Sequence, residues 1–349
     1  DGSVATNGFW SALTIATTER LPLLFFIEDN GYGISVPSTR QTPGGNIAAN
    51  LKSFMNLKVI EGDGADPQQA AMKIAEAVAA VRSWEGPVLL RLQVPRLSGH
   101  SGQDTQTYKP AGLLEDERGR DPLPRLKSFL VPAHLSAADW EALETRANAE
   151  VMQALAEVES REQPDPEGVT RHVFTETDPW GNAEVQRQGG LLPEGYEPPA
   201  GRTEPQPEPT RINMLTAIRR TLEHELGINP KVLVFGEDVG PKGGVHAATL
   251  GLQEKFGEAR VFDTSLSEEG IIGRAVGMAV AGLMPVPEIQ FRKYADPAAE
   301  QLNDCGTMRW RTANRFASPM VVRIPGGFFK CGDPWHSQTN EVQWVHGIG

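Results

Sequence analysis

The sequence predicts an α/β protein with two domains, each built on a parallel sheet flanked by helices. Two observations support this fold class. A short, continuous apolar run at residues 23–27, and the similar, largely apolar stretches at 57–61 and 88–94, have the pattern of strands that are buried on both faces. Stretches with helical periodicity alternate with these runs, and the same alternation resumes after residue 210.

The first predicted domain comprises residues 1–160. A helix is expected over residues 9–19 and precedes the strand at residues 23–27, which ends at Glu28-Asp29-Asn30-Gly31. Asp66-Pro67 is a typical helix start, because proline is favoured at the first helical position. The region therefore reads as a succession of strand and helix units.

A longer helix is expected at the end of this region. Ser136 and Asp139 form a capping-box pattern, and the helix should run to about residue 160. An apolar stripe follows the predicted helix from Trp140 to Val158. We interpret this stripe as packing surface.

Residues 161–210 are rich in proline, glycine and glutamate and show little apolar periodicity. Such a stretch buries too little surface to offset its chain entropy, so we expect an extended, Pro-rich linker. The alternative is an ordered segment wrapped on a neighbour, because Trp180, Leu191 and Tyr196 would otherwise be exposed.

The second predicted domain comprises residues 211–349, and its end without a finished element suggests a continuation. Its expected elements are a helix at 215–226, strands at 232–235 and 260–263, a helix at 268–283 and a strand at 286–290.

The composition narrows the classes of function. A net charge of −12 argues against a nucleic-acid partner, and the apolar segments are too short or too glycine-rich to span a membrane. The two cysteines, Cys305 and Cys331, lack a CxxC spacing and indicate a reducing compartment, so a cytoplasmic location is expected.

The opening Asp1-Gly2-Ser3 precedes a predicted helix and would place a carboxylate beside free backbone N–H groups. A divalent cation and a diphosphate are stabilised together in such a place. Alone, Asp-Gly is more often a turn. Asn30 strengthens the interpretation, because it follows the next strand and consecutive strand ends lie side by side in a parallel sheet.

Two stretches of the first region together resemble the thiamine diphosphate motif, as found in the α part of decarboxylating first components of 2-oxo acid dehydrogenases. They are Asp1-Gly2-Ser3 through Leu13 and Leu21 through Pro37. The resemblance implies that Asp1, Asn30 and the carbonyl of Tyr32 bind Mg²⁺. It also implies that Gly2, Ser3 and Ile34 help to bind thiamine diphosphate.

The resemblance continues along most of the chain. Arg96-Leu97-Ser98-Gly99-His100-Ser101 is similar to the family's active-site loop, which implies a catalytic role for His100. Ser101 matches a phosphorylation site of eukaryotic relatives. Segments after residue 211, among them Phe262 to Glu268 and Glu288 to Phe291, resemble the start of the β part. The whole is then a fusion of α and β parts with two thiamine diphosphate-binding folds.

In the β part the resemblance implies that Glu268 acts on the aminopyrimidine ring, that His336 faces the lipoyl group, and that Phe291 and Tyr294 line the cofactor. Without it, Glu268 would be an ordinary acid at a helix start, and both histidines would be surface loop residues. Histidine titrates near neutrality, which suits proton exchange.

The implied function is oxidative decarboxylation of a 2-oxo acid, with transfer of the acyl group to the lipoyl group of a dihydrolipoamide acyltransferase. Residues Glu288 to Gln301 look more like the branched-chain enzymes, acting on 3-methyl-2-oxobutanoate, than the pyruvate enzymes. The alternatives are a transketolase-like carbon–carbon transferase and a binding module without turnover. The resemblance also implies a homo-oligomer.

Several departures from the family pattern predict an incomplete site. The glycine expected before Asp1 is absent from this sequence, and Asp29 replaces the first asparagine of the common Asn-Asn pair. The upstream diphosphate-gripping region of the α part and the last domain of the β part are also absent. We therefore expect a fragment of a longer enzyme that is inactive by itself.

Overall fold

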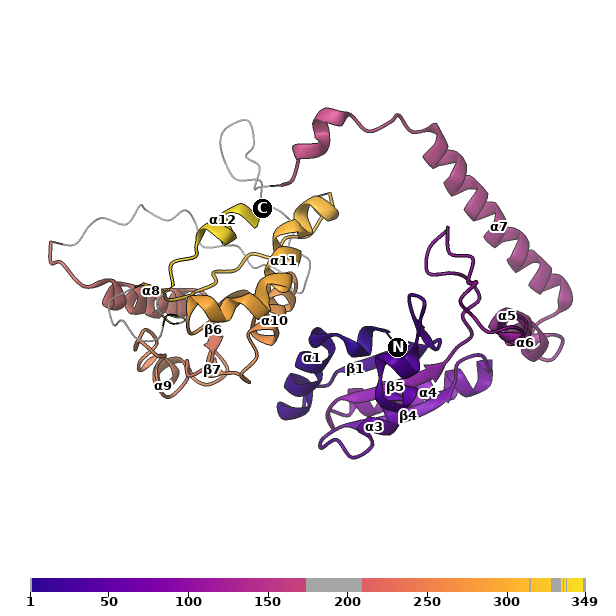
Figure 1. The fold of residues 1–349 in the computed structure, drawn as a ribbon, viewed down its shortest axis with the longest axis horizontal. Helices are drawn as coiled ribbons and strands as arrows, with labels where there is room; N and C mark the ends of the chain where they lie inside the picture. The colour runs from indigo at the N-terminus through magenta and orange to yellow at the C-terminus, as the bar shows by residue number, and fades with distance from the viewer. Residues whose placement is uncertain are drawn as a thin grey trace. The chain divides into compact units, whose positions relative to one another are not determined.

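A computed structural model describes residues 2–173, 209–313, 315–327, 334, 336 and 338–347 (Figure 1). The chain divides into two compact units, Asp1–Pro164 and Asp165–Gly349. Each unit contains its own three-stranded sheet, as the α/β fold class predicts. Most of the predicted linker, residues 174–208, lies outside the described residues.

The sheet of the first unit is parallel and has the strand order β1-β5-β4. Its strands are β1 (Leu24–Asp29), β4 (Lys58–Asp63) and β5 (Val88–Gln93), close to the predicted runs. Strand β5 lies in the centre and is buried over most of its length, because helices cover both faces of the sheet. This is the arrangement expected of continuous apolar strands.

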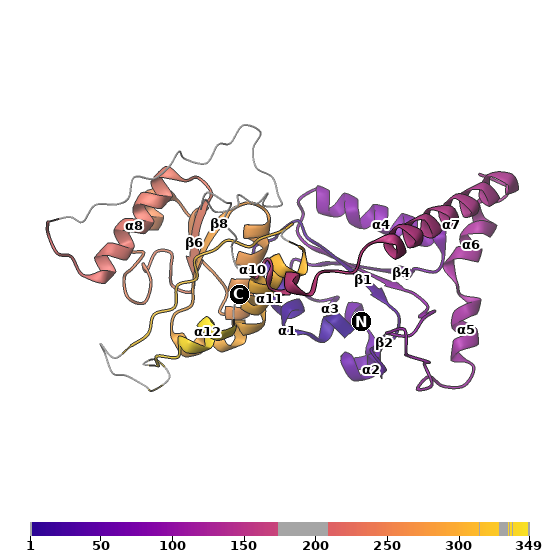
Figure 2. The same ribbon diagram turned by 90° about the horizontal axis from the view of Figure 1, so that it is seen from above.

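Helices on the two faces of this sheet bury separate clusters (Figure 2). Helices α1 (Asn7–Thr18) and α3 (Ile47–Leu51) pack on one face through residues such as Leu13 and Leu89. Helix α4 (Pro67–Arg82) packs on the other face. The unit also contains η1 (Gly2–Ala5), β2 (Tyr32–Gly33), β3 (Val36–Pro37), α2 (Ser38–Gln41), η2 (Pro43–Gly45), α5 (Leu113–Gly119) and α6 (Pro122–Leu130).

Helix α7 (Ala137–Ser160) begins where the capping box predicts, since the Ser136 hydroxyl accepts a hydrogen bond from the Asp139 amide at 3.1 Å. The prediction that its apolar stripe is packing surface is wrong for most of its length. Only Trp140 is buried, whereas Val151 is 65% exposed and Val158 is 59% exposed. Helical periodicity marks an apolar face without fixing what covers it.

The second unit repeats the architecture with the parallel strand order β7-β6-β8. Its strands are β6 (Val232–Gly236), β7 (Val261–Asp263) and β8 (Met284–Glu288). Helices α8 (Met214–Ile228) and α9 (Leu252–Phe256) bury one cluster with the sheet, and α10 (Glu268–Val280), η4 (Arg292–Ala298) and α11 (Ala299–Arg311) bury another. Elements η3 (Pro166–Thr170) and α12 (Val342–Gly347) complete the unit.

Two predicted boundaries in this unit are corrected. Helix α10 ends at Val280 instead of residue 283, because Gly282 adopts a positive φ of 91° and turns the chain into β8. Strand β8 therefore begins at Met284, two residues before the predicted start. Within the described ranges, every helix is too short or too polar to cross a membrane.

Candidate functional site

The loop that follows β1 is shaped by side-chain hydrogen bonds to its own backbone. The Asn30 amide oxygen accepts from the Tyr32 N–H at 3.1 Å, and Asp29 accepts from the Gly31 N–H at 3.0 Å. Gly31 has a φ of 82° and Ile34 a φ of 57°. A β-branched residue in the left-handed region costs on the order of 1–3 kcal/mol, so surrounding contacts must hold Ile34 there.

Asp29, the departure from the family's Asn-Asn pair, has a local explanation. Its carboxylate forms an ion pair with Arg91 at 2.6 Å, and both side chains are buried. Arg91 comes from the neighbouring strand β5 and also pairs with Glu61 of β4 at 3.0 Å. A buried guanidinium requires such partners, because its desolvation is costly. Asp29 therefore serves the sheet and leaves Asn30 at the strand end.

The residues of this loop fit a divalent cation and a diphosphate. Asn30 uses one of its two acceptor positions on Tyr32, and an amide oxygen and a backbone carbonyl are typical ligands of a hard cation. Gly2 lies so near that a Cβ added to it would stand 3.1 Å from the Gly33 Cα. This close approach leaves little room for a side chain at Gly2, so η1 packs against the loop of the predicted ligands.

Asp1, the third predicted magnesium ligand, lies outside the described residues. Ser3 lies in the 3₁₀ turn η1 and its carbonyl accepts from the Thr6 N–H at 3.2 Å. Among the described residues, no group of three histidine, cysteine, aspartate or glutamate side chains is arranged to hold a metal. A cation here would depend on amide and carbonyl oxygens together with Asp1.

The segment that carries His100 is organised around Asp104. This carboxylate accepts hydrogen bonds from the His100 N–H at 2.7 Å, the Gln106 N–H at 2.8 Å and the Tyr108 hydroxyl at 2.9 Å. These donors, the His100 N–H first, hold the pKa of Asp104 below its usual value. Sequence reasoning missed Asp104, since nothing in its spacing distinguishes it from a solvated acid.

This segment also contacts the loop after β1. The Arg96 guanidinium donates to the Ile34 carbonyl, and the Tyr108 hydroxyl lies 3.3 Å from the same oxygen. The pairing of β1 with β5, in which Asp29 faces Gln93, brings the two loops to one edge of the sheet. The structure therefore brings together the predicted residues Asn30, Tyr32 and Ile34 and the loop of His100, whose side chain is exposed.

In the second unit Glu268 is the first residue of α10. Ser267 caps the helix by accepting a hydrogen bond from the Gly270 N–H at 3.2 Å. The neighbouring serine thus supplies the cap, and Glu268, which is half-buried, lies in the first helical turn, where a carboxylate also interacts favourably with the helix dipole. Glu269, the next residue, is buried, and burial raises the pKa of its carboxyl.

A second acid, Glu237, lies close enough to Glu268 for the two charges to interact. It follows β6, and burial, then the charges of Glu268 and Asp238, raise its pKa to about 7. One of its carboxyl oxygens is buried without a hydrogen-bond partner in the described structure. Such an orphaned acceptor fits a site that receives a polar ligand. The signal in the sequence was an acid directly after a fully apolar strand.

Aromatic residues and a histidine form a second cluster in this unit. The Tyr294 hydroxyl lies 2.7 Å from the His336 Nε2. The centroid of the Phe291 ring lies 4.4 Å from that of the His336 ring and 5.6 Å from that of the Tyr294 ring. The predicted residues Phe291, Tyr294 and His336 therefore lie together. The ring of His246, a residue without a predicted role, also lies near this cluster, with its centroid 5.9 Å from that of Phe291.

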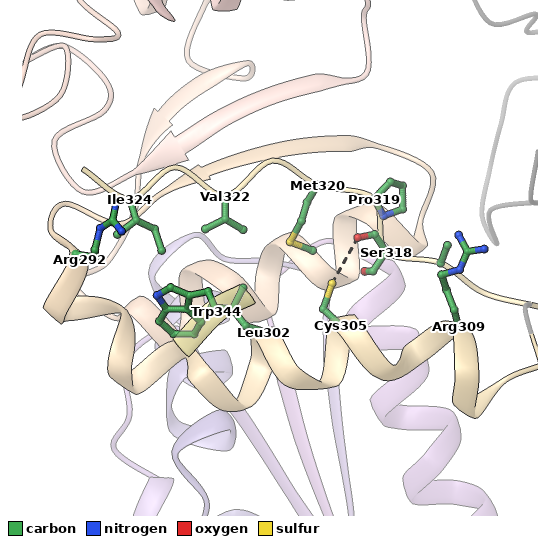
Figure 3. A pocket seen from close by; sticks show the side chains of 12 residues that line it. Arg292, Leu302, Cys305, Arg309, Ser318, Pro319, Met320, Val322, Ile324 and Trp344 are labelled. Carbon is green, nitrogen blue, oxygen red and sulfur yellow. Dashed lines mark hydrogen bonds between the residues drawn. The ribbon is translucent and has the colours of Figure 1, made fainter. Parts of the chain in front are cut away.

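A pocket of about 550 Å³ lies elsewhere in the second unit (Figure 3). Its walls come from α11, from residues 317–324 and from Trp344, and the Cys305 thiol lies 3.5 Å from the Ser318 carbonyl. Burial raises the pKa of that thiol. Glu237, Glu268 and His336 do not line this pocket, so it is separate from the predicted chemistry.

Comparison with known proteins identifies the class of each unit. Residues 1–167 match the family described as dehydrogenase E1 component, and residues 210–343 match the transketolase pyrimidine-binding domain. Both families bind thiamine diphosphate. The chain thus carries, in one polypeptide, matches to two families that bind thiamine diphosphate.

Three named relatives are similar to part of this chain. The chain is 45% identical over 141 residues to the 2-oxoisovalerate dehydrogenase subunit beta of Pseudomonas aeruginosa, covering 40% of each chain. It is 40% identical over 147 residues to the pyruvate dehydrogenase E1 component subunit beta of Leifsonia xyli, covering 42% of this chain and 44% of the relative. It is 43% identical over 139 residues to the 3-methyl-2-oxobutanoate dehydrogenase subunit beta of Mycobacterium tuberculosis, covering 40% of each. The chain therefore spans about two fifths of the length of these relatives.

Proposed function

We propose that this protein catalyses the oxidative decarboxylation of 2-oxo acids, with 3-methyl-2-oxobutanoate and its branched-chain homologues as preferred substrates. The observation that carries the proposal is the acid pair at the head of α10. Glu268 faces a second carboxyl, Glu237, whose pKa of about 7 keeps it partly protonated at neutral pH. A buried acid that stays partly protonated beside a second carboxyl suits a site that moves protons on a bound ring.

Thiamine diphosphate supplies the nucleophilic carbon and the electron sink for decarboxylation when it is bound. The residues of this chain bind it and handle protons. Glu268 would bind the aminopyrimidine end of the cofactor, and Phe291 and Tyr294 would line its site. His336, which is hydrogen-bonded to Tyr294, exchanges a proton with the lipoyl sulfur or the substrate oxygen. His100 has the corresponding role in the first unit.

The first unit holds the diphosphate through magnesium in this proposal. Asn30 and the carbonyl of Tyr32 supply neutral oxygen ligands, and Asp1 supplies the charged one. The close approach of Gly2 to Gly33 places η1 beside the predicted ligands. The support is the donor chemistry and the turn that presents it.

We further propose two kinds of partner. One is a dihydrolipoamide acyltransferase, whose lipoyl group receives the acyl group. The other is a further copy of the chain, as the resemblance to the family implies. The mention of 2-oxoisovalerate and 3-methyl-2-oxobutanoate in the names of relatives supports the branched-chain substrate over pyruvate.

An assay of the complete protein tests this function. It is mixed with thiamine diphosphate, Mg²⁺ and an artificial electron acceptor, and kcat/KM is compared for 3-methyl-2-oxobutanoate and pyruvate. We expect a preference for the branched-chain acid. Faster turnover of pyruvate would overturn the substrate assignment, and ketol transfer between sugar phosphates would overturn the reaction class.

A further inference from the structure

We propose that Lys109 is a positioning residue for the magnesium half of the site. In this proposal its buried ammonium group holds the ring of Tyr32, and so the backbone carbonyl that serves as a metal ligand, against the start of the His100 loop. The inference rests on the proposed function for the identity of the metal. The contacts of Lys109 stand independently of it.

The Lys109 side chain is completely buried within the first unit. Its ammonium group forms an ion pair with Glu117 of α5, whose side chain is only 9% exposed. It also donates to the Arg96 carbonyl at 3.0 Å and lies 5.6 Å from the centroid of the Tyr32 ring. One cation therefore contacts three segments that are distant in the sequence.

A buried ammonium group persists only where its donors are satisfied, because its transfer from water is costly. Lysine has three donors and no acceptor, and the Glu117 carboxylate and the Arg96 carbonyl account for two of them. The face of the Tyr32 ring provides a further favourable contact for a desolvated cation. Moving the ring would thus leave part of the charge uncompensated.

The position of these contacts relates them to the site. Arg96 begins the loop that carries His100 and donates to the Ile34 carbonyl, while Tyr32 lies two residues before Ile34. The Arg96 guanidinium also lies 5.8 Å from the Tyr32 ring. Two cations of the His100 side therefore contact a single residue of the metal loop, and Lys109 is the one whose side chain has no exposure to water.

The simpler alternative is that the Lys109–Glu117 pair only stabilises the unit. Substitution of both partners separates the two roles, because removing a whole buried pair restores stability far better than removing one member. The test compares Lys109→Met, the double variant Lys109→Met/Glu117→Gln, and Lys73→Met. Lys73 is an exposed lysine paired with Glu76 at 3.3 Å and controls for loss of a surface charge.

Two readouts report on the metal loop. The first is hydrogen–deuterium exchange of the amides of residues 30–37 in the protein without cofactor. The second is the Mg²⁺ concentration that gives half-maximal binding of thiamine diphosphate, measured by calorimetry. For Lys109→Met and for the double variant we expect faster exchange and a roughly tenfold rise in the Mg²⁺ midpoint. For Lys73→Met we expect no change in either.

The positioning role would be overturned if the double variant had the exchange rates and the Mg²⁺ midpoint of the unsubstituted protein. It would also be overturned if Lys109→Met and Lys73→Met gave the same values. If Lys109→Met does not fold, Tyr32→Leu tests the same contact, because it removes the ring and keeps the carbonyl. Tyr32→Leu should reproduce the loss and Tyr32→Phe should not. Failure of the unsubstituted protein to bind thiamine diphosphate would count against the proposed function, while the exchange readout would still decide the role of Lys109.

Discussion

The candidate functional regions of the two units accommodate buried polar groups in opposite ways. Around the loop of Asn30 in the first unit, charges are paired: Asp29 with Arg91, Asp104 with several donors, Lys109 with Glu117. At the head of α10 in the second unit, Glu237 keeps a buried carboxyl oxygen without a partner, and its pKa rises to about 7.

This difference indicates a division of labour. Paired charges fix geometry, so substitutions in the first unit should displace loops and weaken binding without changing the dependence on pH. A buried acid without a partner can gain and lose a proton near neutral pH. Substitutions in the second unit should therefore alter proton transfer. The predictions that follow test this contrast in order of decreasing effect.

The largest effect is expected for Glu268→Gln, which keeps the shape of the side chain and removes its charge. In the complete protein kcat should fall about 10³-fold, within the usual range for loss of a group that assists proton transfer. Glu269→Gln is the matched control, since Glu269 is the next residue of α10 and its side chain is buried. Unchanged kcat in Glu268→Gln would sink the assignment of Glu268.

The second prediction concerns Asp104, the acceptor at the centre of the His100 segment. Asp104→Ala leaves the His100 N–H, the Gln106 N–H and the Tyr108 hydroxyl without this acceptor. Displacement of the loop by about 1 Å should lower kcat/KM roughly 10²-fold while the pH optimum stays in place. The comparison is Asp139→Ala, which affects only the cap of α7. A shifted pH optimum in Asp104→Ala would contradict a purely geometric role.

The strands show how much of the fold can be predicted from the sequence alone. The strands were predictable because β5 and β6 are continuous apolar runs buried on both faces. The predicted start of β8 was late because Pro285 and Pro287 obscure a strand that begins at Met284. On the side of β8 away from β6, the Pro285 and Pro287 carbonyls accept hydrogen bonds from the Val321 and Arg323 N–H groups.

The site residues divide in the same manner. Asn30 and Glu268 were predictable from motifs, whereas Glu237 and Asp104 were not. The significance of Glu237 depends on the register of β6 and β7, which pairs Gly236 with Asp263 and so brings the acids after both strands near each other. That of Asp104 depends on hydrogen bonds within an irregular loop, which has no periodicity to detect.

The third prediction is a change in the pH dependence of stability on removing the charge of Glu237. Its pKa is raised on folding from 4.5 to about 7, so its contribution is fully present below pH 4.5 and is lost as the pH rises through about 7. Glu237→Gln cannot ionise and avoids this loss. At pH 8 it should be about 2 kcal/mol more stable than the unsubstituted protein, and at pH 4 equally stable. If the free energies of unfolding of the two proteins differed by the same amount at every pH, the raised pKa of Glu237 would be refuted.

The smallest effect is expected for the removal of a single tyrosine hydroxyl. Tyr294 in the second unit and Tyr108 in the first unit allow the comparison. Tyr294 lies 2.7 Å from His336 Nε2, and Tyr108 donates to Asp104 at 2.9 Å. Loss of one hydrogen bond, about 1 kcal/mol, should lower the rate of acyl transfer to lipoamide about fivefold in Tyr294→Phe and shift its pH profile, because His336 loses a partner. Tyr108→Phe should speed hydrogen–deuterium exchange in residues 98–107 and leave the pH profile unchanged. If both variants shifted the profile alike, the division between geometric and proton-handling halves would fail.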